Sequence, residues 1–271
     1  MDKQELKQHA LHVREKALQM VYYAQSGHPG GSFSAADILT YLYFVKMDIN
    51  EKNIKGIDRD RFVLSKGHVS PALYAILDEK GLLHEDFHTF RQINSNLQGH
   101  PNMNEVAGVD MSTGSLGQGI SCAVGMAIAG KLDKSSHHIY ALLGDGESEE
   151  GIVWEAMMAA AHRHLDNLTV IFDQNGLQID GFVQEVAGPL PLKEKAEAFG
   201  FFAVECDGHD FDSIEQAFNR CAQVKDKPCA IIAHTVKGKG VSFMENQAGW
   251  HGKAPNAQQF AQAMAELQEG K

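Results

Sequence analysis

The sequence lacks the features that would place the chain in a membrane or outside the cell. No apolar run approaches the length needed to cross a bilayer. The opening residues, Met1 to Glu5, have neither the basic start nor the apolar stretch of a secretory signal. The four cysteines show no short paired spacing, so they indicate neither a zinc site nor a disulfide framework. We therefore expect reduced, buried thiols and a cytoplasmic protein with no membrane partner.

Positive charge is also scarce. The 24 lysines and arginines are outnumbered by 35 aspartates and glutamates, which gives a formal net charge of −11. This balance disfavours non-specific binding to nucleic acids and to anionic membranes. An anionic ligand would have to be held locally, by a metal, by histidines or by backbone N–H groups.

The composition that remains is that of one globular domain. Hydrophobic residues make up 44% of the chain and charged residues 22%, which is ordinary for a globular protein. A chain of 271 residues can form a single large α/β domain. The sequence contains no internal repeat, low-complexity tract or convincing interdomain linker. We therefore expect one domain over residues 1–271.

The hydrophobic pattern predicts helices first and alternating strands and helices afterwards. Ser70 and Pro71 are expected to open a helix as N-cap and first helical residue, and Asp212 with Glu215 forms a plausible capping pair later. The expected helices cover 6–24, 34–42, 70–79, 117–130, 152–164, 212 onward and 256–267. The expected strands cover 61–64, 139–143, 168–172, 202–205 and 229–234. This order predicts an α/β fold class with a parallel central sheet and helices on both faces.

Two polar motifs follow two of the predicted strands directly. Gly144-Asp145-Gly146 follows the strand at 139–143, and Asn175 follows the strand at 168–172. A strand–helix–strand unit makes two parallel and normally adjacent strands, so both motifs are expected at the carboxyl edge, where such sheets bind ligands. Carboxylate and amide oxygens suit a hard cation such as Mg²⁺, which shares phosphate oxygens. The pair predicts a metal-bridged diphosphate, although Gly-Asp-Gly alone could be a tight turn.

Four histidines lie in unusual glycine-containing loops: His28, His68, His100 and His251. Glycine lets the backbone approach a ligand closely, and histidine can donate to phosphate or hydroxyl oxygens and move protons near neutral pH. Any one of the four could be an ordinary surface or core histidine. Four such loops in a chain with a metal–diphosphate motif favour a common site.

A further glycine loop, Thr113 to Gly119, opens a helix, and helix amino termini attract anions. On its own, this loop could be a plain helix-entry turn. Glu147, Glu149 and Glu150 are expected in the first turn of the next helix, where acids interact favourably with the helix dipole. The dipole accounts for at least two of these three acids.

With these residues assembled, the chain resembles the amino-terminal, diphosphate-binding part of transketolase. The Gly-Asp-Gly to Asn stretch matches the thiamine diphosphate signature of that family. Ser-Gly-His-Pro-Gly-Gly, Lys-Gly-His, Gly-His-Pro, Thr-Gly-Ser-Leu-Gly-Gln-Gly and a terminal His-Gly occur in the family's order. The resemblance covers nearly the whole chain. It implies a thiamine diphosphate-binding fold, with residues 1–271 forming the diphosphate-binding (PP) domain.

The resemblance implies a set of cofactor contacts. Asp145, Asn175 and the backbone carbonyl of Leu177 would bind the metal, which would be Mg²⁺ with Ca²⁺ or Mn²⁺ as substitutes. Gly146, Asn175 and His68 would touch the diphosphate. The loop beside the aminopyrimidine and thiazolium rings would contribute Gly114, Ser115 and Leu116.

The resemblance also implies catalytic residues. His28, His100 and His251 would contact the donor ketose and assist proton transfers, and His251 would also lie close to the cofactor. Glu150 matches an acid that links cofactor sites across the subunit interface of this family. The reaction implied is the transfer of a two-carbon ketol unit from a ketose phosphate to an aldose phosphate, with the hard chemistry carried by the cofactor.

Family enzymes continue into a pyrimidine-binding domain and a carboxy-terminal domain, and neither is present in this sequence. We therefore expect a split enzyme: a second subunit would carry the pyrimidine-binding domain, and two copies of each chain would form a heterotetramer. The sequence also leaves open that the chain is part of a longer protein. Alternatives are the alpha subunit of a thiamine-dependent 2-oxo-acid dehydrogenase, a relative of deoxyxylulose-phosphate synthase, and a non-catalytic binding module. The four histidine loops favour sugar chemistry over oxo-acid decarboxylation.

Overall fold

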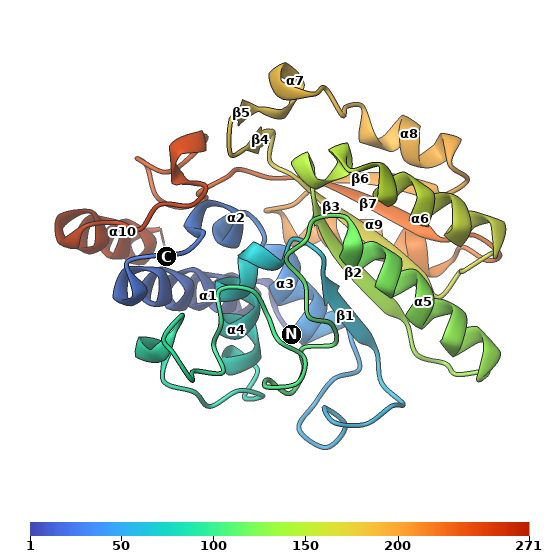
Figure 1. The fold of residues 1–271 in the computed structure, drawn as a ribbon, viewed down its shortest axis with the longest axis horizontal. Coiled ribbons are helices and arrows are strands. Elements are labelled where there is room, and N and C mark those ends of the chain that lie inside the picture. The colour runs from blue at the N-terminus through green and yellow to red at the C-terminus, as the bar shows by residue number, and fades with distance from the viewer. Residues whose placement is uncertain (271) are drawn as a thin grey trace.

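A five-stranded sheet forms the centre of the molecule in the computed structural model, which describes residues 1–270 (Figure 1). The strands are β1 (Arg61–Leu64), β2 (Ile139–Gly144), β3 (Leu168–Gln174), β6 (Phe202–Asp207) and β7 (Cys229–His234). Their order across the sheet is β1-β2-β3-β7-β6, and every neighbouring pair is parallel. All five expected strands are present, and the predicted parallel α/β sheet is confirmed.

Helices cover both faces of this sheet (Figure 1). Side chains alternate along each strand, so Ala141 and Leu143 of β2 enter one hydrophobic cluster while Tyr140 and Leu142 enter the other. The first cluster is completed by α5 (Gln118–Leu132), α6 (Gly151–His162) and α8 (Leu192–Ala198). The second is completed by α1 (Lys3–Ala24), α3 (Ala36–Tyr41), α4 (Ser70–Glu79) and α9 (Phe211–Ala222). Burial on both faces explains why the strands read as continuous apolar runs.

Shorter elements gather around the carboxyl ends of the strands. They are α2 (Pro29–Ser34), the antiparallel pair β4 (Leu177–Gln178) and β5 (Gly181–Phe182), and α7 (Val183–Val186). The last helix, α10 (Ala257–Glu269), packs beside α1 over a small third cluster that contains Trp250. Asn256 caps α10 with a reciprocal bond to Gln259, which places its start where the sequence predicted it.

Three expected helix starts are wrong. Ser70 is the first residue of α4 rather than its N-cap, because its hydroxyl is buried and donates to the carbonyl of Gly99 at 2.9 Å. Asp210, not Asp212, caps α9 by accepting the Asp212 N–H at 3.1 Å. The helix expected from residue 34 begins already at Pro29, is interrupted at Ala35 and ends in a π-helical turn over 42–46. Pro29 can begin this helix because the first turn needs no intrahelical bond from the N–H that proline lacks.

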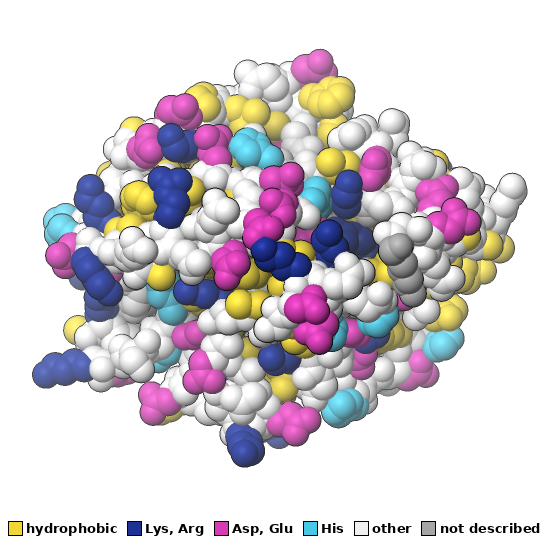
Figure 2. All heavy atoms as spheres, turned by 180° about the vertical axis from the view of Figure 1, so that it is seen from behind, with side chains coloured by type: hydrophobic (Ala, Val, Ile, Leu, Met, Phe, Trp, Pro, Cys, Tyr) yellow, Lys and Arg dark blue, Asp and Glu magenta, His cyan; other side chains and the backbone are white. Residues whose placement is uncertain are grey.

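The four cysteines are free: Cys206, Cys221 and Cys229 are buried, and Cys122 is half-buried rather than buried as expected. None of the helices over residues 1–270 is both long and apolar enough to cross a bilayer. On the face seen in Figure 2, acidic and basic side chains are interspersed. The distribution gives no support to a nucleic-acid partner on that face.

Candidate cofactor and active site

The two polar motifs meet at the carboxyl edge of the sheet. β2 and β3 are adjacent and parallel, with Gly144 opposite Asp173, so the following residues Asp145 and Asn175 emerge together. A cavity of about 240 Å³ lies at this edge. Its lining includes Gly31, Lys66, His68, Leu116, Gly144, Asp145, Gly146, Glu147, Asn175, Leu177, Lys237 and His251. Asp145 and Asn175 therefore lie together at the carboxyl edge of the sheet, as the sequence predicted.

Asp145 is held rigidly by backbone donors. Its carboxylate accepts the N–H of Gly146 at 2.8 Å and that of Gly176 at 2.5 Å, which ties the end of β2 to the loop after β3. The side chain is only 2% exposed. Burial, together with the nearby Asp173 carboxylate, raises the pKa of Asp145 to about 6. A positive charge placed here would relieve that cost, so the position suits a cation.

The three residues predicted to bind a metal, Asp145, Asn175 and Leu177, line the same cavity. Asn175 lies in the buried loop after β3, and its Oδ1 accepts the N–H of Leu177 at 3.2 Å. The carbonyl oxygen of Leu177 accepts a hydrogen bond at 2.8 Å from the Nζ of Lys237. The Lys237 ammonium shows that the Leu177 carbonyl, one of the three predicted metal ligands, can interact with a cation. A carboxylate, an amide oxygen and a carbonyl oxygen together fit a hard divalent cation.

Two buried lysines belong to this site and were not found from the sequence. Lys66 and Lys237 are each 2% exposed. Burial, together with the charge on Lys66, lowers the pKa of Lys237 to about 8. Lysine is rarely so buried without a partner. Two such cations beside a cavity suit an anion such as a diphosphate.

Asp173 anchors Lys66, which lines the cavity. It is fully buried and accepts hydrogen bonds from the Lys66 ammonium, the Thr235 hydroxyl and the Ser34 hydroxyl, the last at 2.6 Å. Burial alone would raise the pKa of Asp173, but the charge of Lys66 and the hydrogen bonds from Lys66, Ser34 and Thr235 together hold that pKa below its usual value. Asp173 is therefore ionised and holds Lys66 in place beneath the cavity.

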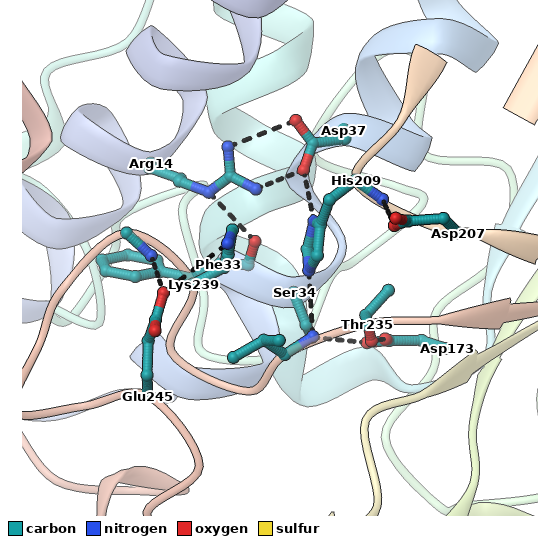
Figure 3. Close-up of polar contacts among 12 residues, drawn as sticks. Arg14, Phe33, Ser34, Asp37, Asp173, Asp207, His209, Thr235, Lys239 and Glu245 are labelled. Atoms are coloured by element: carbon teal, nitrogen blue, oxygen red, sulfur yellow. Dashed lines mark hydrogen bonds and ion pairs between the residues drawn. The ribbon is translucent and has the colours of Figure 1, made fainter. Parts of the chain in front are cut away.

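A second buried network supports the strand end that carries Thr235 (Figure 3). The guanidinium of Arg14 pairs with both carboxylate oxygens of Asp37. Asp37 Oδ2 lies 2.7 Å from Nδ1 of His209, and Nε2 of His209 accepts the N–H of Val236 at 2.9 Å. This imidazole therefore fixes the backbone between Thr235 and Lys237. A larger cavity of about 490 Å³ borders Arg14 and Asp37, but it contains none of the predicted site residues.

The four loop histidines come together as expected. The ring centroid of His28 lies 5.1 Å from that of His68, 5.5 Å from that of His251 and 6.3 Å from that of His100. The centroids of His68 and His251 are 5.1 Å apart. The Nδ1 atoms of His28 and His251 are buried and have no hydrogen-bond partner within the described chain. Orphaned polar atoms of this kind point to a ligand that is bound during function.

The pKa values of all four rings are lowered, which keeps them neutral at neutral pH. Burial first, and then the charge of Arg91, lowers the pKa of His28 to about 4. Burial and Lys237 lower the pKa of His251 to about 3. The pKa values of His68 and His100 are also lowered, mainly by burial. At neutral pH each ring therefore has one donor nitrogen and one acceptor nitrogen.

The glycine loop packs closely against the histidines. A Cβ on Gly114 would lie 2.8 Å from Cδ2 of His100, and Gly114 has φ +149°, a conformation that other residues rarely adopt. Leu116 lines the cavity. Ser115 is exposed and does not line it. Its predicted cofactor contact therefore stays a prediction.

The three acids after Gly146 have three different environments. The expectation that these acids lie in the first turn of the next helix is wrong: Glu147 and Glu149 lie in a separate 3₁₀ turn over 146–149, and α6 begins only at Gly151. Glu147 is 2% exposed and accepts hydrogen bonds from Ser65 Oγ at 2.5 Å, Gly117 N–H at 2.8 Å and Gly144 N–H at 3.1 Å. It ties β1, the glycine loop and β2 together. Glu149 accepts a bond from Gln178 at 2.8 Å. Glu150 is the exposed N-cap of α6 and lies outside the cavity lining, so its predicted role stays a prediction.

Comparison with known proteins identifies the class. Residues 6–268 match the family model described as transketolase, thiamine diphosphate binding domain. The chain belongs to this family. The architecture agrees with that of the transketolase from Campylobacter jejuni, with a TM-score of 0.92 and 36% identity over 99% of this chain and 43% of that one.

Relatives of matching length are named as subunits. The chain is 42% identical to one subunit of the apulose-4-phosphate transketolase of Phocaeicola vulgatus, covering 94% of this chain and 91% of that protein. It is 42% identical to the 6-deoxy-6-sulfo-D-fructose transketolase subunit SqwG of Clostridium sp. strain MSTE9, covering 95% and 94%. Human transketolase is 44% identical over 92% of this chain, which spans 40% of that relative's length. The prediction of a transketolase-type transferase subunit is confirmed at this level.

Proposed function

We propose that this chain is the diphosphate-binding subunit of a two-chain transketolase. In this role it moves a two-carbon ketol unit from a ketose phosphate to an aldose phosphate. The observation that carries the proposal is the convergence of four neutral histidines beside the Asp145–Asn175 pair. Residues 1–271 act as one PP domain in the cytoplasm. A partner subunit supplies the pyrimidine-binding domain, and two copies of each chain form a heterotetramer.

The residues present fit thiamine diphosphate and a divalent metal. Asp145, Asn175 and the Leu177 carbonyl would hold Mg²⁺, while Gly146, Asn175 and His68 would contact the diphosphate. Lys66 and Lys237 add positive charge, because both are buried at the same cavity. Gly114, Ser115 and Leu116 would lie beside the two rings of the cofactor. When bound, the cofactor supplies the electron sink that lets the carbon–carbon bond beside a ketose carbonyl break.

The histidines handle the protons of the sugar. A neutral imidazole can accept a proton at one nitrogen and donate from the other, so His28, His100 and His251 can bind the carbonyl and hydroxyl oxygens of the substrate. His28 and His251 are half-buried, which limits the access of water to them and strengthens these hydrogen bonds. Glu150, the N-cap of α6, links the cofactor sites across the subunit interface.

The test is ketol transfer by the purified complex. We expect His28→Ala and His251→Ala to lower kcat about 100-fold or more, since general acid–base catalysis contributes roughly 10²–10⁴. Thiamine diphosphate should still bind after His28→Ala. The control is the exposed His162→Ala on α6, which should leave kcat unchanged. The isolated chain should be inactive and should regain activity with its partner. Full activity of the isolated chain, or of both histidine variants in the complex, would contradict the proposal.

A further inference from the structure

Three side chains that can bind a metal meet where α1 packs against α4 (Figure 1). His9 and His12 lie one turn apart on α1, and Glu79 is the last residue of α4. Their ligand atoms all lie within 4.8 Å of one another, and no other group of three histidine, cysteine or acidic side chains over residues 1–270 is so compact. Because α4 starts shortly after His68 and rises about 1.5 Å per residue, Glu79 lies about 14 Å along the helix from that end. The cluster is therefore separate from the cofactor cavity, which none of the three residues lines.

Both imidazoles converge on one carboxylate oxygen. The Nδ1 atoms of His9 and His12 lie 2.8 Å and 2.9 Å from Oε1 of Glu79. Three atoms bonded to a tetrahedral Zn²⁺ ion at about 2.1 Å are about 3.4 Å apart, so the two distances would have to widen by only about half an ångström. The three side chains are half-buried rather than fully enclosed, and rotation about their bonds can supply this change.

Neighbouring side chains hold the two imidazoles in this orientation. The ring of His9 stacks on Phe44 with the centroids 4.0 Å apart. The amide Nε2 of Gln8 lies 2.8 Å from Nε2 of His12. An amide nitrogen only donates, so the proton of the neutral His12 ring is on Nδ1 and points to Glu79. A metal-bound imidazole normally gives its other N–H to an acceptor, and a turned Gln8 amide would present its oxygen there.

The charges around the cluster suit a cation. Glu79 pairs through its second oxygen, Oε2, with Lys16 and so leaves Oε1 to the histidines. Lys16 also pairs with Asp78 at 2.9 Å, and this second carboxylate offsets its positive charge. Two imidazole nitrogens and one carboxylate oxygen are a ligand set for Zn²⁺ and similar transition metals, whereas Mg²⁺ and Ca²⁺ take oxygen ligands.

We propose that His9, His12 and Glu79 bind a Zn²⁺ ion that clips α1 to α4. Nδ1 of each histidine and Oε1 of the glutamate supply three ligands. The side chain of His12 is 36% exposed, so water can reach the fourth position. Each imidazole stays neutral and carries its proton on Nε2 once Nδ1 binds the metal. The ion stabilises the folded chain and is distinct from the Mg²⁺ of the cofactor.

The experiment titrates zinc chloride into the full chain by isothermal calorimetry, after EDTA treatment and in excess Mg²⁺, which competes at oxygen-only sites. We expect one Zn²⁺ per chain at this site. His12→Ala should weaken zinc affinity at least about 10-fold, because even the loss of a group that supports a ligand costs about 10- to 100-fold. Glu79→Gln removes the charge at constant size and should have the same effect. The control His162→Ala changes an exposed histidine on α6 and should leave the affinity unchanged.

The histidines of the cofactor cavity could compete for zinc, so the titration is repeated in the variant His28→Ala/His251→Ala. Zinc binding that persists in this variant and is lost on addition of His12→Ala supports the inference. Binding that is lost in His28→Ala/His251→Ala but retained in His12→Ala would place the ion in the cofactor cavity and overturn the inference.

A second readout tests the clip in the same His28→Ala/His251→Ala background. Zn²⁺ at about 100-fold above its Kd should raise the melting temperature by at least about 3 °C, since a ligand that binds only the folded chain stabilises it. Addition of His12→Ala should abolish this rise. Far-UV circular dichroism verifies that each variant is folded, and the more exposed His12 carries the test if Glu79→Gln does not fold. A melting temperature that zinc leaves unchanged, or raises equally with and without His12, would overturn the inference.

Discussion

Paired charges carry much of the local order near the site. Asp173 holds Lys66, and Asp37 holds Arg14. Each pair is almost completely buried, so each charge depends on the presence of the other. A charge that loses its partner must be desolvated without compensation. Loss of either partner is therefore expected to destabilise the fold by more than the loss of a hydrogen bond between uncharged groups.

The Arg14–Asp37 pair gives a test of this dependence (Figure 3). Asp37→Ala leaves the guanidinium of Arg14, which is 8% exposed, without its carboxylate. We expect the free energy of unfolding to fall by about 3–5 kcal/mol, measured by urea denaturation at pH 7. The double variant Arg14→Met/Asp37→Leu removes both charges and should lose much less. A loss below about 1 kcal/mol for Asp37→Ala would show that Arg14 does not depend on this partner.

The elements of the site follow from simple sequence rules, but several of its residues do not. The strands carry long apolar runs because both faces of the sheet are buried, so β2 and β3 and the motifs after them could be predicted. Lys66, Lys237 and Glu147 were missed as site residues because charged residues are normally exposed. Their burial depends on partners that are distant in the sequence: Asp173, the Leu177 carbonyl and Ser65. Only the fold brings these groups together.

The packing of the loop before His68 against the glycine loop gives a prediction at the scale of elements. A Cβ on Gly67 would lie 2.6 Å from the carbonyl carbon of Thr113 and 2.7 Å from the nitrogen of Gly114. Gly67→Ala must therefore push the segment 113–116 away from His68. We expect a loss of about 1–3 kcal/mol in stability and at least about a 10-fold loss in affinity for thiamine diphosphate, measured in the complex by calorimetry.

The matched control lies in α5. Apart from the backbone of its own helix, Gly125 has no atom within 4 Å of the position that a Cβ would take, so Gly125→Ala adds the same methyl group without a clash. It should raise the free energy of unfolding by roughly 0.5–1 kcal/mol, as alanine usually does in a helix, and leave cofactor affinity unchanged. Equal affinity in the two alanine variants would contradict a role for this packing.

Several groups with shifted pKa values gather in one site of the molecule. As the pH falls, the shift of Asp145 stabilises the folded chain, whereas the shifts of the histidines destabilise it. The pKa of Asp145 is raised to about 6, so the folded chain takes up this proton before the unfolded chain does as the pH falls. That group alone stabilises the fold on acidification. His28 and His251 act in the opposite direction. Their pKa values are lowered to about 4 and about 3, so the unfolded chain binds protons first, from about pH 6.5 downward.

These histidines outnumber the two carboxyl groups whose pKa values burial raises, Asp145 and Glu147, since burial also lowers the pKa of His138 to about 4. We therefore expect the stability of the isolated, cofactor-free chain to decrease from about pH 6.5 toward pH 4, measured by urea unfolding at fixed ionic strength. The variant His28→Asn/His251→Asn should flatten this dependence, because it removes two groups that must stay neutral in the folded state. His162→Asn, at an exposed position, should leave the slope unchanged. A wild-type stability that is constant or rises on acidification would show that the histidines are not kept neutral by the fold. The proton transfers assigned to them would then have to begin from charged rings.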